Sequence, residues 1–298
     1  MNQSIIAKLK NYGFAKYSNE ILTSGELIEL KNFINKLFSD KSIDINKSSN
    51  ALVIDNLAGI DSNIDFLLTK IITHKDVKLI LNNVLGDNYK VCEITVRRSV
   101  PGDFGLYLHQ DAPGETGMSL LLTDNYRGDG ATAFLSKSHQ LPRWSRKIAW
   151  SNVALSSPFL SPLTGKIGNV GFFFNRTWHA RLKNMSNKTH EVLLMSFFPQ
   201  GTAYNCNWDE ESLKSITQPE LRKLFDPNED KRILDGDHNQ VSAIDDKVKN
   251  LPYVLKLESL KLLNVLYRVK FLGLKVLILH IIFLPIRWLY RLLHLIKR

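Results

Sequence analysis

Cysteine is scarce in this sequence of 298 residues, and its scarcity argues against two kinds of protein. Only Cys92 and Cys206 occur, far apart in the chain and outside any C-x-x-C pattern. Neither a disulfide framework nor a zinc–thiolate site is indicated. The first residues also lack a continuous apolar stretch and a small-residue cleavage site, so we expect no signal peptide. These absences favour a reducing compartment, and we expect the protein in the cytoplasm.

Net positive charge is largely missing from the main part of the chain, although the formal net charge of the whole chain is +10. Residues 253–298 contain nine lysines and arginines against one acid, Glu258, and therefore carry +8 of that charge. A nucleic-acid interface on the main body would need a clustered basic patch there. We therefore expect no nucleic-acid partner.

The C-terminal residues 253–298 also lack a long charge-free run. The longest, from Val276 to Ile286, has eleven residues, whereas a membrane-spanning helix needs about 20. Lys261, Arg268 and Lys275 recur every seven residues and place a basic stripe on an otherwise apolar helix. This composition predicts an amphipathic helical tail that lies on an anionic membrane surface. The alternatives are a re-entrant segment, or a helical hairpin that packs on the main body or on a second subunit.

Residues 1–88 have patterns that are typical of helices. A capping-box spacing that starts at Thr23, followed by apolar residues every three or four positions, predicts a helix over 24–38. A second apolar pattern, which ends at Gly86, predicts another helix over 65–85. We expect both helices to be scaffold.

From Tyr89 the pattern changes to short runs rich in β-branched and aromatic residues, separated by Gly, Pro, Asn and Asp. Such a pattern is typical of an antiparallel barrel or sandwich. The expected strands are 90–98, 105–110, 117–123, 131–135, 148–155, 169–178 and 190–198. The predicted class is therefore α+β, with one domain over 1–204 whose barrel or sandwich part covers 89–204; the family resemblance given below implies that this part is a jelly roll. A polar linker with short helices is expected over 205–252, before the tail.

A strand-like run that ends in His109-Gln110-Asp111 carries the candidate site. Residues two apart in a strand point to the same side, so His109 and Asp111 can reach one ion. His179, at the end of another apolar run, supplies a third ligand. Two imidazoles and a carboxylate form the facial triad that suits iron(II) and leaves three positions for a bidentate 2-oxo acid and dioxygen. The alternative is that both histidines are ordinary half-buried strand residues.

A second His-x-Asp spacing shows that this motif is weak by itself. His74 and Asp76 also have it, but they lie in the expected helix over 65–85. Residues two apart in a helix project in nearly opposite directions and cannot share an ion. We therefore expect metal binding only at residues 109 and 111.

Several short segments occur in a characteristic order along the chain: Tyr12-Gly13-Phe14, His74-Lys75-Asp76-Val77, Pro101-Gly102, His109-Gln110-Asp111, Gly130 to His139, Gly168 to His179 and Asn184-Met185-Ser186. Over roughly residues 10–200 they resemble the phytanoyl-CoA dioxygenase family of iron(II)/2-oxoglutarate oxygenases. The resemblance implies a double-stranded β-helix (jelly-roll, cupin-like) fold that uses iron(II), 2-oxoglutarate and dioxygen. It also implies decarboxylation of 2-oxoglutarate to succinate and CO2, coupled to hydroxylation of an unactivated C–H bond. In this family the position of Gln110 helps to hold the co-substrate.

The sequence departs from the family at one position. The family usually has an arginine eleven residues after the second metal histidine, where it pairs with the distal carboxylate of 2-oxoglutarate. Here that residue is His190, a shorter and single-pronged partner. Arg181 lies two residues after His179, and we expect Arg181, with or without His190, to bind the carboxylate. The alternatives are that Arg181 is a surface residue, or that the site has lost the co-substrate.

Arg97 and Arg98 are lesser candidates for binding an anionic substrate, because adjacent arginines more often form a solvated strand edge.

Together with the basic tail, the metal site predicts an oxygenase that hydroxylates a lipid or a lipid-linked substrate, such as a glycolipid. It would act on the cytoplasmic face of a membrane. Two other functions stay open. One is a catalytically silent jelly roll that binds a ligand or scaffolds a membrane complex; the other is an oxygenase for a soluble metabolite, with the tail used for oligomerisation. The oligomeric state itself stays open.

Overall fold

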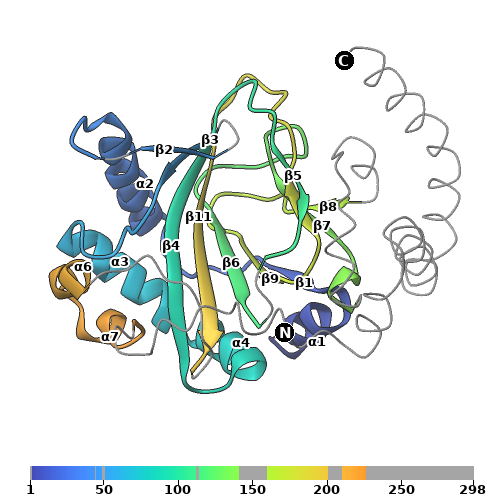
Figure 1. The fold of residues 1–298 in the computed structure, drawn as a ribbon, viewed down its shortest axis with the longest axis horizontal. Helices are drawn as coiled ribbons and strands as arrows, with labels where there is room; N and C mark the ends of the chain where they lie inside the picture. Colours follow the sequence, from blue (N-terminus) through green and yellow to red (C-terminus); the bar gives the residue numbers. More distant parts are fainter. Residues whose placement is uncertain are drawn as a thin grey trace, which may run out of the picture.

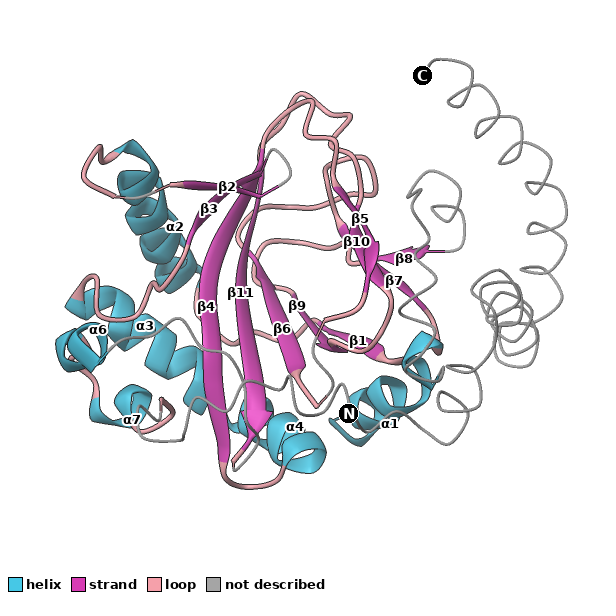
Figure 2. Cartoon of the chain, in the orientation of Figure 1, coloured by secondary structure: helices cyan, strands magenta, loops and turns pink. Residues whose placement is uncertain are grey.

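Two antiparallel β-sheets face each other in the computed structural model, and helices cover the outer side of the larger sheet (Figure 1, Figure 2). The structure describes residues 2–43, 45–48, 51–111, 114–140, 160–200 and 210–225. Helices and antiparallel strands are combined as the sequence predicts.

The larger sheet has seven strands in the order β1-β9-β6-β11-β4-β3-β2. Their bounds are Phe14–Tyr17 (β1), Asn46–Ser48 (β2), Ala51–Ile54 (β3), Tyr89–Ser99 (β4), Thr116–Leu121 (β6), Val170–Phe174 (β9) and His190–Pro199 (β11). The smaller sheet has four strands in the order β5-β10-β7-β8. Their bounds are Leu106–His109 (β5), Thr132–Leu135 (β7), Leu160–Pro162 (β8) and His179–Arg181 (β10). Pairing of β4 with β11 runs from Ser99 opposite His190 to Tyr89 opposite Pro199, so these two strands form the spine of the larger sheet.

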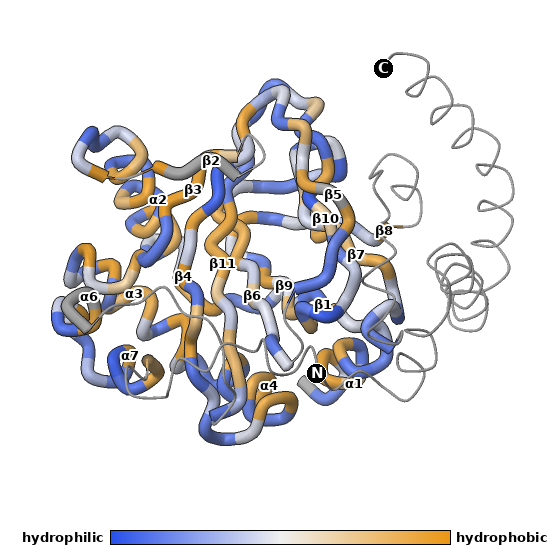
Figure 3. Tube along the Cα trace, viewed as in Figure 1, coloured by the Kyte–Doolittle hydropathy of each residue, from blue (hydrophilic) through white to orange (hydrophobic). Residues whose placement is uncertain are grey.

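One hydrophobic core joins the helices to the outer face of the larger sheet. The helices are α1 (Asn2–Tyr12), α2 (Ser24–Ser39), α3 (Ser62–Thr73), α4 (Lys75–Leu85), α6 (Glu210–Ser215) and α7 (Pro219–Arg222), and a 3-10 turn, η1, spans Ser138–Gln140. Leu30 and Ile34 of α2 and Ile94 and Val96 of β4 are fully buried in this core. Figure 3 shows hydrophobic residues along β11 and on the helices beside the sheet. The helical layer leaves the inner face of the sheet available for a site.

The two expected helices have different outcomes. The capping box at Thr23 is confirmed, because its hydroxyl accepts from the Glu26 backbone N–H at 3.3 Å and the Glu26 carboxylate accepts from the Thr23 N–H at 2.9 Å. The single helix expected over 65–85 is wrong, since α3 and α4 are separated at His74, whose ψ is 131°. The His74 Nδ1 accepts from the Asp76 N–H at 3.3 Å and so caps α4. The apolar pattern runs across the break because both helices pack on the same core.

The helical interpretation of residues 1–88 is wrong at β1, β2 and β3. β1 pairs with β9, and β3 pairs with β4, so partners distant in sequence stabilise these short strands. The strand expected over 169–178 ends at Phe174, and a turn separates it from β10. The strand expected over 148–155 lies outside the described residues.

Part of the expected linker over 205–252 packs on the helices. Ile216 and Leu221 are buried in the main core. The Asp65 carboxylate of α3 accepts hydrogen bonds from the N–H and the hydroxyl of Thr217, at 2.7 and 3.0 Å. Residues 226–252 and the predicted tail over 253–298 lie outside the described residues. Among the residues that the structure does describe, no helix is both long and apolar enough to cross a membrane.

Candidate metal centre

Side chains of His109, Asp111 and His179 come together beside the smaller sheet, as predicted. Each offers one ligand atom, and the three atoms lie within 4.8 Å of one another. The Asp111 carboxylate is 3.4 Å from the His109 Nε2 and 3.2 Å from the His179 Nε2. Neighbouring donors about 2.1 Å from one octahedral ion lie about 3 Å apart, so this arrangement fits a facial triad. Within the described part of the chain, no other group of histidine, cysteine or acidic residues has this geometry.

Strand pairing explains why residues so distant in sequence meet. His109 of β5 lies directly opposite His179 of β10, and the centroids of the two rings are 4.3 Å apart. Asp111 follows His109 by two residues and so projects to the same side. Its backbone N–H donates to the Asn175 carbonyl at 2.9 Å, which holds the chain in place beyond the end of β5.

The His179 ring is oriented by its neighbours. Its Nδ1 lies 2.8 Å from the Thr177 carbonyl, so Nδ1 carries the proton and Nε2 is left to bind a metal. Phe173 and Phe134 pack beside the ring, with centroid distances of 5.5 and 6.3 Å. Neither aromatic residue is predicted from the sequence, because the pairing of β7 with β10, which places Phe134 opposite His179, is not visible in local patterns.

The charges of the triad suit a divalent cation. Burial raises the pKa of Asp111, but hydrogen bonding to His179 and the charges of both histidines lower it more, to about 2. Burial lowers the pKa of His179, whereas its bond to Asp111 raises it, with a net increase. The carboxylate is therefore ionised at neutral pH, as a metal ligand must be.

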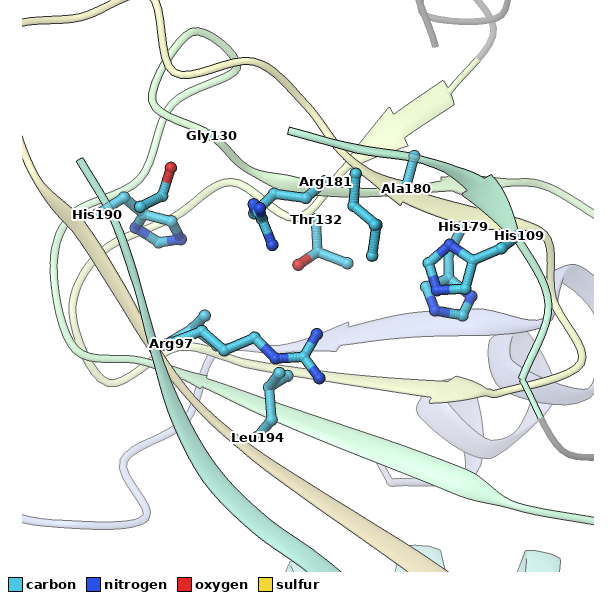
Figure 4. Close-up of a pocket in the computed structure, with 12 residues that line it drawn as sticks. Arg97, His109, Gly130, Thr132, His179, Ala180, Arg181, His190 and Leu194 are labelled. Carbon is cyan, nitrogen blue, oxygen red and sulfur yellow. The ribbon is translucent and has the colours of Figure 1, made fainter. Parts of the chain in front are cut away.

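A cavity of about 430 Å³, partly open to solvent, lies beside the triad between the two sheets (Figure 4). Leu106, Thr132 and Arg181 line it on one side, and Arg97, Ser99, His190, Val192 and Leu194 line it on the other. In Figure 4 the cavity extends from the two triad histidines, past both arginines, to His190.

Arg181 lines this cavity and is not on the surface. Its expected contact with the distal carboxylate of 2-oxoglutarate stays a prediction. Only 8% of its side chain is exposed. Its Nε and Nη2 donate to the Asp103 carboxylate at 3.0 and 3.3 Å, and Asp103 also accepts from the Ser99 hydroxyl at 2.7 Å. Burial lowers the pKa of Arg181, the Asp103 carboxylate opposes this, and the positive charge of Arg97 lowers it further. Asp103 therefore fixes the guanidinium in the cavity wall.

His190 lies at the far end of the cavity from the triad (Figure 4). Its Nδ1 is 2.9 Å from the Thr123 hydroxyl, and only 3% of the residue is exposed. Burial, together with the charge of Arg181, lowers its pKa to about 4. The imidazole is therefore neutral at physiological pH and cannot supply the positive charge of an arginine.

Arg97 lines the cavity, although the sequence predicts it only as a lesser candidate for binding an anionic substrate. β4 lies inside the larger sheet between β11 and β3, so Arg97 and Arg98 do not form a solvated edge. Because neighbouring strand residues point to opposite faces, Arg97 enters the cavity while Arg98 turns outward. There Arg98 pairs with Glu191 at 2.5 Å and lies over the Phe38 ring.

Gln110 is placed differently from the triad. It follows the last residue of β5, and its side-chain amide donates to the Arg176 carbonyl. Gln110 is not among the residues that line the cavity. Its expected contact with the co-substrate therefore stays a prediction.

No protein-family model matches the sequence, and no curated protein matches it. Solved structures do match. EvdMO1 is 15% identical with a TM-score of 0.53 over 67% of this chain, which spans half the length of EvdMO1. The non-haem α-ketoglutarate-dependent epimerase SnoN from nogalamycin biosynthesis is 15% identical, with a TM-score of 0.56 over 71% of this chain and 88% of SnoN. HygX from Streptomyces hygroscopicus, solved with nickel, 2-oxoglutarate and hygromycin B, is 13% identical, with a TM-score of 0.55 over 70% of this chain and 90% of HygX.

The chain has the jelly-roll fold of SnoN and HygX. The predicted fold class is thereby confirmed. At these identities the likeness concerns the fold, so the narrower resemblance to phytanoyl-CoA dioxygenases stays a prediction.

Proposed function

We propose that this protein is an iron(II)- and 2-oxoglutarate-dependent dioxygenase. The observation that carries the proposal is the convergence of His109, Asp111 and His179, with their ligand atoms within 4.8 Å of one another at the edge of a cavity. Two imidazoles and a carboxylate on one face of an ion are the ligand set of non-haem iron(II) oxygenases. Likeness of fold to SnoN, which is named as α-ketoglutarate-dependent, supports the same co-substrate.

The reaction that we assign is a hydroxylation. 2-Oxoglutarate, O2 and a substrate C–H bond give succinate, CO2 and an alcohol, with one oxygen atom in the new succinate carboxylate and the other in the hydroxyl group. Bound iron(II) would supply the dioxygen chemistry. The chain's own part is to hold three donors in place, through the Thr177 carbonyl for His179 and the Asn175 carbonyl for Asp111. Leu106, Val192 and Leu194 line the cavity and limit its water.

For the substrate, we propose a lipid or a lipid-linked molecule, reached from the cytoplasmic face of a membrane. The support is the composition of residues 253–298, which combine aliphatic residues with nine basic ones. A tail that lies on anionic lipid would raise the local concentration of such a substrate. This fold also supports other reactions, because SnoN is named as an epimerase. Among these reactions we propose hydroxylation.

Succinate formation tests the catalytic part of the proposal. The full-length protein, supplied with iron(II), ascorbate and 2-oxoglutarate in air, is expected to form succinate, measured by mass spectrometry. Asp111→Ala should abolish it, because the triad loses its only carboxylate, whereas Asp87→Ala at an exposed position should not. If the wild-type protein neither forms succinate nor binds 2-oxoglutarate with metal, the chain is the catalytically silent alternative.

Vesicle co-sedimentation tests the membrane part. The full-length protein is expected to bind vesicles that contain phosphatidylserine and to bind neutral vesicles far less. Changing Lys261, Arg268 and Lys275 together to glutamine should weaken that binding about 100-fold, since each basic residue near the surface contributes about 1 kcal/mol. Equal binding by this variant and the wild type would contradict an electrostatic contact through the tail.

A further inference from the structure

We propose that Arg97 and Arg181, from opposite walls of the cavity, together bind the distal carboxylate of 2-oxoglutarate, in place of an anchor at position 190. This inference rests on the proposed function and assigns its co-substrate site to particular residues. It adds Arg97 to the residue expected from the sequence and removes His190 from the anchor.

The positions of the two arginines fit a five-carbon dicarboxylate. Arg181 and the metal ligand His179 are two residues apart on β10, and both line the cavity. Strand geometry separates two such residues by about 6.6 Å, which suits an extended 2-oxoglutarate whose 2-oxo acid end is at the triad. Figure 4 shows the Arg97 side chain extending from β4 across the cavity below Arg181.

Electrostatics point to an anion between them. Both arginines line the same cavity, so two positive charges face one partly enclosed space. Arg97 pairs with Glu93 at 3.2 Å, and Arg181 pairs with Asp103 at 3.0 Å. The Arg97 Nε is buried and has no hydrogen-bond partner among the described residues. A carboxylate in the cavity would relieve the repulsion and accept from that N–H.

His190 lacks what an anchor needs. Its ring is held by the Thr123 hydroxyl, and it is almost completely buried at the far end of the cavity. A neutral imidazole offers at most one N–H donor to a carboxylate and no charge. The pairing of β4 with β11 supplies the replacement, because it places Arg97 directly opposite Val192, two residues along β11 from His190. The basic group of the anchor therefore comes from β4 in this chain and not from position 190 of β11.

Equilibrium binding of two 2-oxo acids tests the assignment without turnover. The full-length protein, loaded with nickel(II) in place of iron(II), is titrated calorimetrically with 2-oxoglutarate and with 2-oxovalerate, which has a methyl group in place of the distal carboxylate. The wild type should prefer 2-oxoglutarate. Arg97→Met should weaken 2-oxoglutarate binding ~10- to 100-fold, the range for a hydrogen bond to a charged group, and leave 2-oxovalerate binding within about twofold. Arg181→Met, combined with Asp103→Leu to avoid an unpaired buried charge, should give the same selective loss.

Two controls decide between residues. Arg98→Met changes the adjacent arginine, which faces away from the cavity, and His190→Gln changes the position that carries arginine in the family; both should keep the wild-type preference. The assignment is overturned if Arg97→Met affects both acids equally or neither, or if the selective loss appears in His190→Gln. Should Arg97→Met fail to fold, Arg97→Gln takes its place. If the wild type binds neither acid in the presence of nickel(II), the proposed function falls as well, so the two failures are distinguishable.

Discussion

Protonation of His190 should control how the stability of this protein depends on pH. Only 3% of the residue is exposed, and burial lowers its pKa from 6.5 to about 4. In the unfolded chain the imidazole regains its ordinary pKa. Between these two values the unfolded state binds more protons than the folded state, so stability decreases as the pH falls through this window. At about pH 5 the expected loss is about 2 kcal/mol, since one pKa unit corresponds to about 1.36 kcal/mol.

Replacing His190 with glutamine removes this titration and keeps a polar partner for Thr123. Urea unfolding of the wild type and of His190→Gln should therefore be compared at about pH 7.5 and about pH 5. Effects of other titrating groups are common to both proteins and cancel in the difference. The wild type is expected to lose about 2 kcal/mol more than the variant on acidification. A difference below about 0.5 kcal/mol would refute the idea that a buried, neutral imidazole occupies this end of the cavity.

Three further predictions concern the same region. Asp103→Asn should destabilise the fold by about 3–5 kcal/mol because Arg181 stays buried without its ionic partner, and a double-mutant cycle with Arg181→Met, followed by urea unfolding, should show strong coupling. Gly105→Ala should cost more than about 2 kcal/mol, since its φ is +80° and a Cβ atom would lie 2.2 Å from the Arg181 carbonyl, whereas Gly128→Ala, with nothing within 4 Å, should be nearly neutral. Nickel(II) at about 100 times its Kd should stabilise the wild type by about 2.7 kcal/mol in thermal melts, and Asp111→Ala should abolish that gain.

The triad could be predicted because its chemistry and its local geometry appear together in the sequence. A His-x-Asp spacing at the end of a strand brings His109 and Asp111 to one side. The same spacing at His74 lies at the junction of α3 and α4 and not inside one helix, and there the His74 ring caps α4. The short strands and turns after Tyr89 predicted an antiparallel barrel or sandwich, and the family resemblance narrowed this to a jelly roll. The pair His109 and Asp111 needed only near neighbours in the chain, whereas His179 is distant in sequence and meets them through the pairing of β5 with β10.

The other cavity residues depend on strand pairing, which local patterns do not give. Arg97 and Arg98 are indistinguishable in the sequence, and only the position of β4 between β11 and β3 decides which of them enters the cavity. The break at His74 was missed because the apolar pattern continues through it. β10 was read as part of a longer strand, since three residues carry too little pattern to separate them from Val170–Phe174.

His109 and His179 belong to the smaller sheet, whose strands are only three or four residues long, whereas β4 and β11 have eleven and ten residues. Few backbone hydrogen bonds hold such short strands, so this sheet should open locally more often than the long pair. An ion shared by His109 and His179 would act as a clasp across β5 and β10. The binding energy of the ion would then slow amide exchange in the smaller sheet far more than in β4 and β11. Metal binding would therefore stabilise the smaller sheet as well as supply the iron for catalysis.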